Sequence, residues 1–168
     1  MSNGPKSEQN LRDAFAGESQ ANRKYLAFAK QAETDGHSQI ARLFRAAAEA
    51  ETIHAHNHLQ ALEGIKSTRD NLLEAIAGET HEFKSMYPAM ISDAESEGAG
   101  KALRSFQYAV AVEKVHASLY QKAFDTLGTQ GESFDYFLCP VCGHTVERNA
   151  PDTCDICGAK GSVFIRIS

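Results

Sequence analysis

The stretch Glu51-Thr52-Ile53-His54 has a second copy, Glu113-Lys114-Val115-His116, 62 positions further along the chain. Both copies lie in segments where apolar residues recur every three or four positions, which predicts amphipathic helices. Three residues is about one helical turn, so each copy directs a carboxylate and an imidazole to the same side of its helix. The repeat therefore predicts two matched pairs of metal ligands on two helices.

A lone glutamate precedes each pair in a repeated context, as Ala16-Gly17-Glu18 and as Ala77-Gly78-Glu79. The first half of the domain thus recurs in the second half. One Glu from each of two helices and a Glu-x-x-His from each of two others form the ligand set of a carboxylate-bridged two-metal site in a four-helix bundle. The six candidate metal ligands are Glu18, Glu51, His54, Glu79, Glu113 and His116.

Four helical segments are predicted between about residues 8 and 128, and a glycine closes each of them. Each segment carries a glutamate near the middle of its core-facing stripe. An ionised carboxylate taken out of water costs several kcal/mol unless it is paired or bound to metal, and mutual repulsion adds to this cost. Cations resolve the problem, and mixed carboxylate and imidazole ligands suit iron or manganese.

Three further residues lie near these candidate ligands. Glu82 follows Glu79 by three positions, but its counterpart in the first repeat is Ala21, so spacing leaves both a ligand and a surface glutamate open. Tyr25 and Tyr87 lie within about two turns of a glutamate ligand, which is compatible with core packing or with a position beside the site. Three other histidines, His37, His81 and His144, are expected to be solvated.

All four cysteines fall in the last 30 residues, as Cys139-Pro140-Val141-Cys142 and Cys154-Asp155-Ile156-Cys157. Paired C-x-x-C units predict a tetrathiolate metal site, with iron and zinc both open. So few residues cannot build much of a core, so a metal must hold this module together. The predicted organisation is a helical domain over residues 1–128, a polar linker over 129–135 and a β-rich metal-binding module over 136–168.

Composition excludes several other classes of protein. The net charge is -5 and the sequence pI is about 5.8, so nothing indicates nucleic-acid binding. No apolar run is long enough for a membrane span, and the N-terminal residues do not have the pattern of a signal peptide. A cytoplasmic location is expected.

Together, the repeated motifs and the two C-x-x-C-G units resemble the rubrerythrin family over essentially the whole chain. The resemblance implies a ferritin-like four-helix bundle followed by a rubredoxin-like domain. It further implies that Glu51 and Glu113 bridge two irons, that Glu18 binds the first iron, and that Glu79 and His116 bind the second. By the same resemblance, Glu82 exchanges with His54 on the first iron between redox states. The family also implies one iron bound by Cys139, Cys142, Cys154 and Cys157, and it places Tyr25 and Tyr87 around the bundle site.

The implied function is a non-haem di-iron peroxidase that reduces hydrogen peroxide to water in defence against oxidative stress. Electrons would come from a donor such as a rubredoxin or an NAD(P)H-dependent reductase and pass through the four-cysteine iron. Two alternatives remain open: a ferritin-like iron oxidation and storage protein, and a non-enzymatic interaction module stabilised by zinc. An absorption spectrum separates iron from zinc, because rubredoxin-type iron is red and zinc is colourless.

The expected route of electrons predicts a homodimer or a higher homo-oligomer. At about 1.5 Å per helical residue, the predicted helix end at Gly128 lies roughly 22 Å beyond Glu113. A cysteine module beyond that end would be far from the metals of its own chain. We therefore expect the module of one chain to serve the site of its neighbour, unless it folds back along the bundle.

Overall fold

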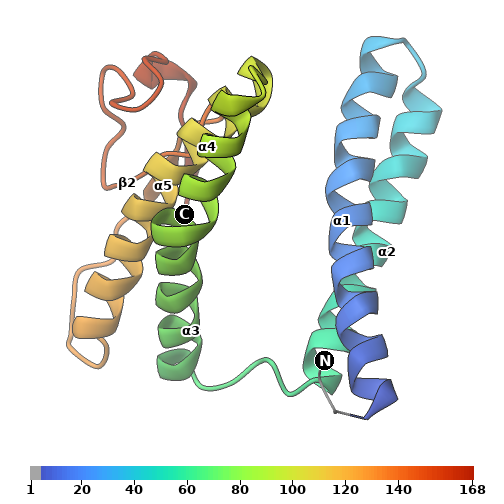
Figure 1. Cartoon of the computed structure of the whole chain (residues 1–168), viewed down its shortest axis with the longest axis horizontal. Helices are drawn as coiled ribbons and strands as arrows, with labels where there is room; N and C mark the ends of the chain where they lie inside the picture. The colour runs from blue at the N-terminus through green and yellow to red at the C-terminus, as the bar shows by residue number, and fades with distance from the viewer. Residues whose placement is uncertain (1–4) are drawn as a thin grey trace. The chain divides into compact units, whose positions relative to one another are not determined.

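A computed structural model describes residues 5–168; residues 1–4, the start of the domain predicted over 1–128, lie outside the described part. The helices come first, and three short strands follow at the C-terminal end (Figure 1). This order confirms the predicted fold class of helices followed by a small β-rich module. The elements are α1 (Lys6–Thr34), α2 (Ser38–Ala61), α3 (Thr68–His81), the π-helical turn η1 (Glu82–Met86), α4 (Tyr87–Ser96), α5 (Gly100–Asp125), β1 (Tyr136–Leu138), β2 (Thr145–Glu147), the 3-10 turn η2 (Gly161–Val163) and β3 (Ile165–Ile167).

The chain divides after Lys66 into two compact units. The first unit is an antiparallel hairpin of α1 and α2, drawn in blue to cyan in Figure 1. Its buried positions are mostly alanines, which let the two helices approach closely: Ala29, Ala32, Ala41, Ala48 and Ala55. The buried amide of Asn22 donates to the Ala48 carbonyl at 2.7 Å and to the Thr52 hydroxyl at 2.8 Å, which fixes α1 against α2 one turn from Glu18.

The second unit contains α3, η1 and α4, which follow one another without a break and pack along α5. At η1 the amide of Tyr87 donates to the Glu82 carbonyl five residues back. Pro88 explains this local change, because proline has no amide hydrogen to donate to the carbonyl of Lys84 and its ring clashes with that group in a regular helix. The spacing of apolar residues predicts a regular helix here, so the π turn was not predicted.

The two helix hairpins have matching connections. Their connecting loops have equal length, and each contains a glycine with positive φ, Gly36 at 80° and Gly98 at 66°. The lone glutamates of the repeats are 61 positions apart, whereas the Glu-x-x-His pairs are 62 positions apart. The second hairpin therefore has one additional residue between its ligands. A π turn accommodates one residue more than an α turn, so η1 accounts for the difference.

The C-terminal module is a three-stranded antiparallel sheet in the order β2-β1-β3. Tyr136 of β1 pairs with Glu147 on one side and with Ile167 on the other. The most deeply buried residues of the module are Cys139 and Cys154. A sheet of three-residue strands whose buried cysteines lie in the adjoining loops has little apolar core of its own.

The module folds back along α5 instead of extending beyond the end of that helix. Lys122 of α5 forms an ion pair with Glu147 of β2, and the cationic groups of Lys122 and Arg148 both lie over the Phe134 ring. Leu119 and Leu138 line one apolar pocket between helix and sheet. The predicted delivery of electrons between chains assumed that the cysteine module lies beyond the end of α5. That assumption is wrong, because the linker reverses direction after α5.

Candidate metal centres

The first cluster of candidate ligands lies on the α1–α2 hairpin. Glu18 of α1 meets Glu51 and His54 of α2, with one ligand atom from each residue within 4.8 Å of the others. His54 Nδ1 lies 2.9 Å from Glu51 Oε2. The His54 side chain is 53% exposed, so this cluster is open on one side.

The second cluster repeats this arrangement on the other hairpin. Glu79 of α3 meets Glu113 and His116 of α5 within the same 4.8 Å limit. His116 Nδ1 lies 2.8 Å from Glu113 Oε2 and 3.8 Å from Glu79 Oε1. The six predicted bundle ligands therefore form two groups of three, one in each unit.

In the second cluster, ionisation of one carboxylate makes ionisation of its neighbours less favourable. Burial, a hydrogen bond with Glu113 and the negative charges of Glu113 and Glu82 together raise the pKa of Glu79 from 4.5 to about 7. A cation removes this repulsion, and oxygen and imidazole nitrogen donors suit iron or manganese. The donor set fits the metals that the sequence predicts.

The raised pKa of Glu79 predicts how the stability of the metal-free protein depends on pH. The unfolded chain releases this proton near pH 4.5, so between about pH 4.5 and 7 the folded state binds more protons. The contribution of Glu79 therefore lowers the free energy of unfolding as pH rises through this window. Urea unfolding of the metal-free protein should show this fall, and Glu79→Gln should flatten it. The same change at exposed Glu95 is the control; an unchanged slope in Glu79→Gln would contradict the assignment.

Glu82 begins the π turn beside the second cluster, and Tyr87 directly follows the turn. Burial raises the pKa of Tyr87, and the charges of Glu82, Glu113 and Glu79 raise it further, so the phenol lies close to these carboxylates. Glu82 is outside the group of three ligand atoms, and its role as an exchanging ligand stays a prediction. In the other unit, the Tyr25 ring packs at 6.3 Å from Phe28 and at 6.1 Å from Phe44.

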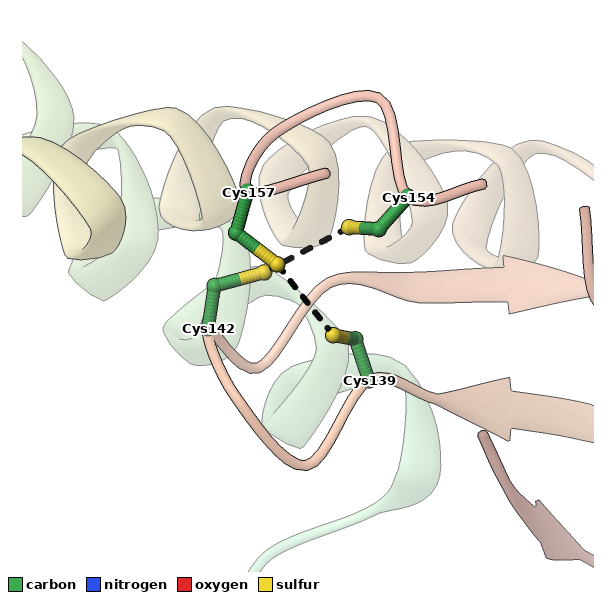
Figure 2. Close-up of side chains that lie close together, drawn as sticks. All are labelled: Cys139, Cys142, Cys154 and Cys157. Carbon is green, nitrogen blue, oxygen red and sulfur yellow. Dashed lines mark hydrogen bonds between the residues drawn. The ribbon is translucent and has the colours of Figure 1, made fainter. Parts of the chain in front are cut away.

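The four cysteines converge from two loops of the C-terminal module (Figure 2). Sγ of Cys139 lies 3.6 Å from Sγ of Cys157, and the same distance separates Cys142 from Cys154. Burial raises the pKa of the Cys139 thiol, but hydrogen bonds with the backbone at Cys142 and Val141 outweigh it and lower this pKa to about 7. Four thiols so close together fit one tetrahedrally bound iron or zinc ion.

His144 was expected to be solvated, and this prediction is wrong. Only 7% of the residue is exposed, and its Nδ1 lies 3.6 Å from Sγ of Cys154. It directly follows Cys142-Gly143, so the turn that brings Cys142 to the site also buries the imidazole. Hydrogen bonds to the ligand sulfurs are one of the factors that set the reduction potential of a sulfur-bound iron centre.

Thr145 joins the cysteine module to the second cluster, and no sequence motif predicted this role. His116 Nε2 lies 3.1 Å from Thr145 Oγ1, and the threonine hydroxyl donates to the Gly143 carbonyl at 3.2 Å. Because that hydroxyl hydrogen is committed to Gly143, its oxygen accepts from Nε2–H of His116. The hydrogen bond fixes the tautomer in which Nδ1 is free to bind a metal.

Comparison with known proteins matches both parts of the chain. The family model for rubrerythrin covers residues 9–124, and the model for the rubredoxin-like domain of rubrerythrin covers residues 137–165. Rubrerythrin-2 of Clostridium acetobutylicum is 37% identical over 171 residues, covering 92% of each chain. Nigerythrin of Nitratidesulfovibrio vulgaris is 37% identical over 170 residues, covering 93% of this chain and 84% of its own length. The solved structure of fully reduced, all-ferrous nigerythrin has a TM-score of 0.59 at 34% identity and covers 99% of this chain and 89% of its own.

These matches agree with the ligand sets described above. The chain carries the ligands of a ferritin-like di-iron site and a rubredoxin-like site formed by four cysteines. Among the helices described over residues 5–168, none combines the length and apolar character needed to cross a bilayer.

Proposed function

Because the chain belongs to the rubrerythrin family, we propose that it is a non-haem di-iron peroxidase that reduces hydrogen peroxide to water in oxidative-stress defence. One observation carries this proposal: the four-cysteine site connects to a ligand of the second cluster through the Thr145 hydrogen bonds. Iron storage does not need such a connection, whereas a repeatedly reduced oxidoreductase does.

The two clusters would hold two irons between them, in the domain predicted over residues 1–128. Glu51 and Glu113 would bridge the metals, with Glu18 and His54 on the first and Glu79 and His116 on the second. When bound, iron supplies the electrons that break the O–O bond and the charge that stabilises the departing oxygens. The cysteine module would hold the third iron, with zinc as a possible substitute.

The chain's own residues would orient the ligands and provide protons. Reduction of one peroxide to two waters consumes two electrons and two protons. The Tyr87 phenol would be protonated, because burial raises its pKa and the neighbouring carboxylates raise it further, so it can donate a hydrogen bond toward the site. Thr145 holds His116 in the tautomer that directs Nδ1 at the metal.

Electrons would enter through the cysteine module of the same chain. Gly143 directly follows Cys142, its carbonyl accepts from Thr145, and Thr145 accepts from His116. The expected donor is a rubredoxin or an NAD(P)H-dependent reductase, and the expected location is the cytoplasm.

We expect Thr145→Val to slow reduction of the bundle site while both metal sites stay filled. The substitution keeps the side-chain shape but removes the hydroxyl between Gly143 and His116. Loss of such a supporting hydrogen bond typically lowers activity by about 10–100-fold. Stopped-flow measurement of bundle reduction after electrons enter the four-cysteine iron tests this. Thr145→Ser keeps the hydroxyl and is the control; equal rates for valine and wild type would refute the role of Thr145.

An anaerobic peroxide assay tests the function itself. The purified protein, with its iron content measured, is mixed with hydrogen peroxide and a reducing donor, and peroxide loss is followed. Repeated turnover supports the peroxidase. Accumulation of ferric iron from added ferrous iron and oxygen, without peroxide turnover, would instead support iron storage. A colourless protein that contains zinc and shows neither activity would support the interaction module.

A further inference from the structure

We propose that the groove between α1 and α2 binds a small hydroxyl donor, water or hydrogen peroxide, at Oδ1 of Asn22 and admits it to the Glu51 side of the first cluster. The inference deepens the proposed function, on which it rests for the choice of peroxide as a ligand. It adds a binding position and an entrance for small molecules, both within one helix hairpin.

The carboxamide of Asn22 is buried and uses only one of its two ends. Asn22 is 6% exposed, and its Nδ2 group donates to the Ala48 carbonyl and to the Thr52 hydroxyl. Among the buried side-chain nitrogen and oxygen atoms described over residues 5–168, only Asn22 Oδ1 has no hydrogen-bond partner in the protein. A buried acceptor without a partner is unfavourable, so this position favours a molecule that donates a hydrogen bond.

The orientation of this carboxamide is fixed by its neighbours. The Ala48 carbonyl can only accept, and the Thr52 hydroxyl donates its hydrogen to the same carbonyl at 3.1 Å. Exchanging the nitrogen and oxygen of Asn22 would place its oxygen 2.7 Å and 2.8 Å from these two acceptors. Oδ1 is therefore the end that remains free to accept.

A groove of about 240 Å³ lies beside this amide and reaches a metal ligand. Asn22 lines it together with the Glu51 carboxylate and the Ser19 hydroxyl, which are further hydrogen-bond partners for a small polar molecule. Exposed Arg23 and His56 also line it, so the groove opens to solvent. Its volume is well above the roughly 15 Å³ that one water needs, so it has room for several waters or a peroxide.

The equivalent groove on the second hairpin lacks these features. Thr80 is the counterpart of Ser19, 61 positions later, and lines a groove of about 480 Å³ together with Phe83 and Lys114. None of the predicted metal ligands is among the described residues that line this second groove. A hairpin of this kind therefore folds without a buried amide, so we assign Asn22 a role besides packing.

Crystal structures of the oxidised full-length protein at atomic resolution test the binding position. Without peroxide, one ordered water should lie within about 3.2 Å of Asn22 Oδ1. After a soak in hydrogen peroxide, elongated density for two bonded oxygen atoms identifies peroxide as a ligand, whereas an unchanged single peak identifies water. A protein group bonded to Oδ1, or no density there in either crystal, would overturn the proposal.

Ser19→Leu tests the entrance, because it fills the groove and leaves the Asn22 amide in place. The Ser19 hydroxyl donates to the Phe15 carbonyl of its own helix at 2.6 Å, so its loss breaks no contact between helices. Nitric oxide binds ferrous iron without peroxidase turnover, and its rate of binding to the reduced bundle should fall several-fold. Thr80→Leu makes the same change in the second groove and should leave this rate unchanged. Equal rates for Ser19→Leu and wild type, at equal iron content, would overturn the entrance.

Asn22→Leu separates the binding position from the proposed function. Loss of one hydrogen bond should lower the second-order rate of bundle oxidation by hydrogen peroxide by roughly 3- to 10-fold. If neither Asn22→Leu nor Ser19→Leu slows this oxidation, the entrance is overturned and the proposed function stands. If the wild-type protein does not react with peroxide but shows density at Oδ1, the proposed function is overturned and the binding position stands.

Discussion

Replacing Glu51 or Glu113 by alanine is expected to empty the bundle of iron while leaving the absorption of the four-cysteine iron unchanged. Each of these carboxylates would serve both metals, so its loss removes a ligand from both at once. Peroxide turnover should fall by more than about 100-fold, the upper end of the range for residues that only support ligands. Metal analysis and the visible spectrum of the purified variants provide the measurement.

Glu49→Ala is the matched control for this experiment. Glu49 is exposed on α2, two positions before Glu51, so it points away from the cluster. Its loss should leave iron content and turnover unchanged. A variant without Glu51 or Glu113 that still held two bundle irons with full activity would show that the bridging assignment is wrong.

Cys139→Ser is expected to unfold the C-terminal module and abolish turnover that depends on an electron donor. The strands have three residues each, and the fully buried Cys139 lies at the centre of the module, so metal binding supplies most of its folding free energy. The red absorption should disappear. The bundle should keep its iron, because α3 and α5 pack together without the module.

The reduced bundle of this variant should still consume one equivalent of peroxide in a single turnover. This distinguishes loss of electron supply from loss of the reaction site. Val141→Ala, at an exposed position between two of the cysteines, is the control and should retain both activities. Full donor-driven turnover in Cys139→Ser would mean that electrons enter the bundle directly.

The sequence predicted best what depends on neighbours along one helix. Glu51 and His54 are three residues apart, so their proximity follows from helical geometry alone, and the structure places them 2.9 Å apart. The clustering of the cysteines was likewise predictable from the C-x-x-C spacing. These features require no knowledge of how distant segments pack.

Features that depend on distant contacts escaped prediction. Thr145 and His116 are 29 residues apart and meet only because the linker turns back along α5. His144 is buried for a related reason, since its surroundings come from the second cysteine loop. The π turn had a local signal in Pro88, but helical periodicity concealed it because apolar residues continue on both sides.

The π turn bears on the ancestry of the chain. If the two halves descend from one duplicated hairpin gene, they began as equals, and the two metals they bound were equivalent. Tyr25 follows Glu18 by seven positions and Tyr87 follows Glu79 by eight, with the π turn between the second pair. One inserted codon accounts for this offset. It leaves Glu82 at the start of a widened turn that the first half does not have, so a single residue distinguishes the helical surroundings of the two ligand clusters.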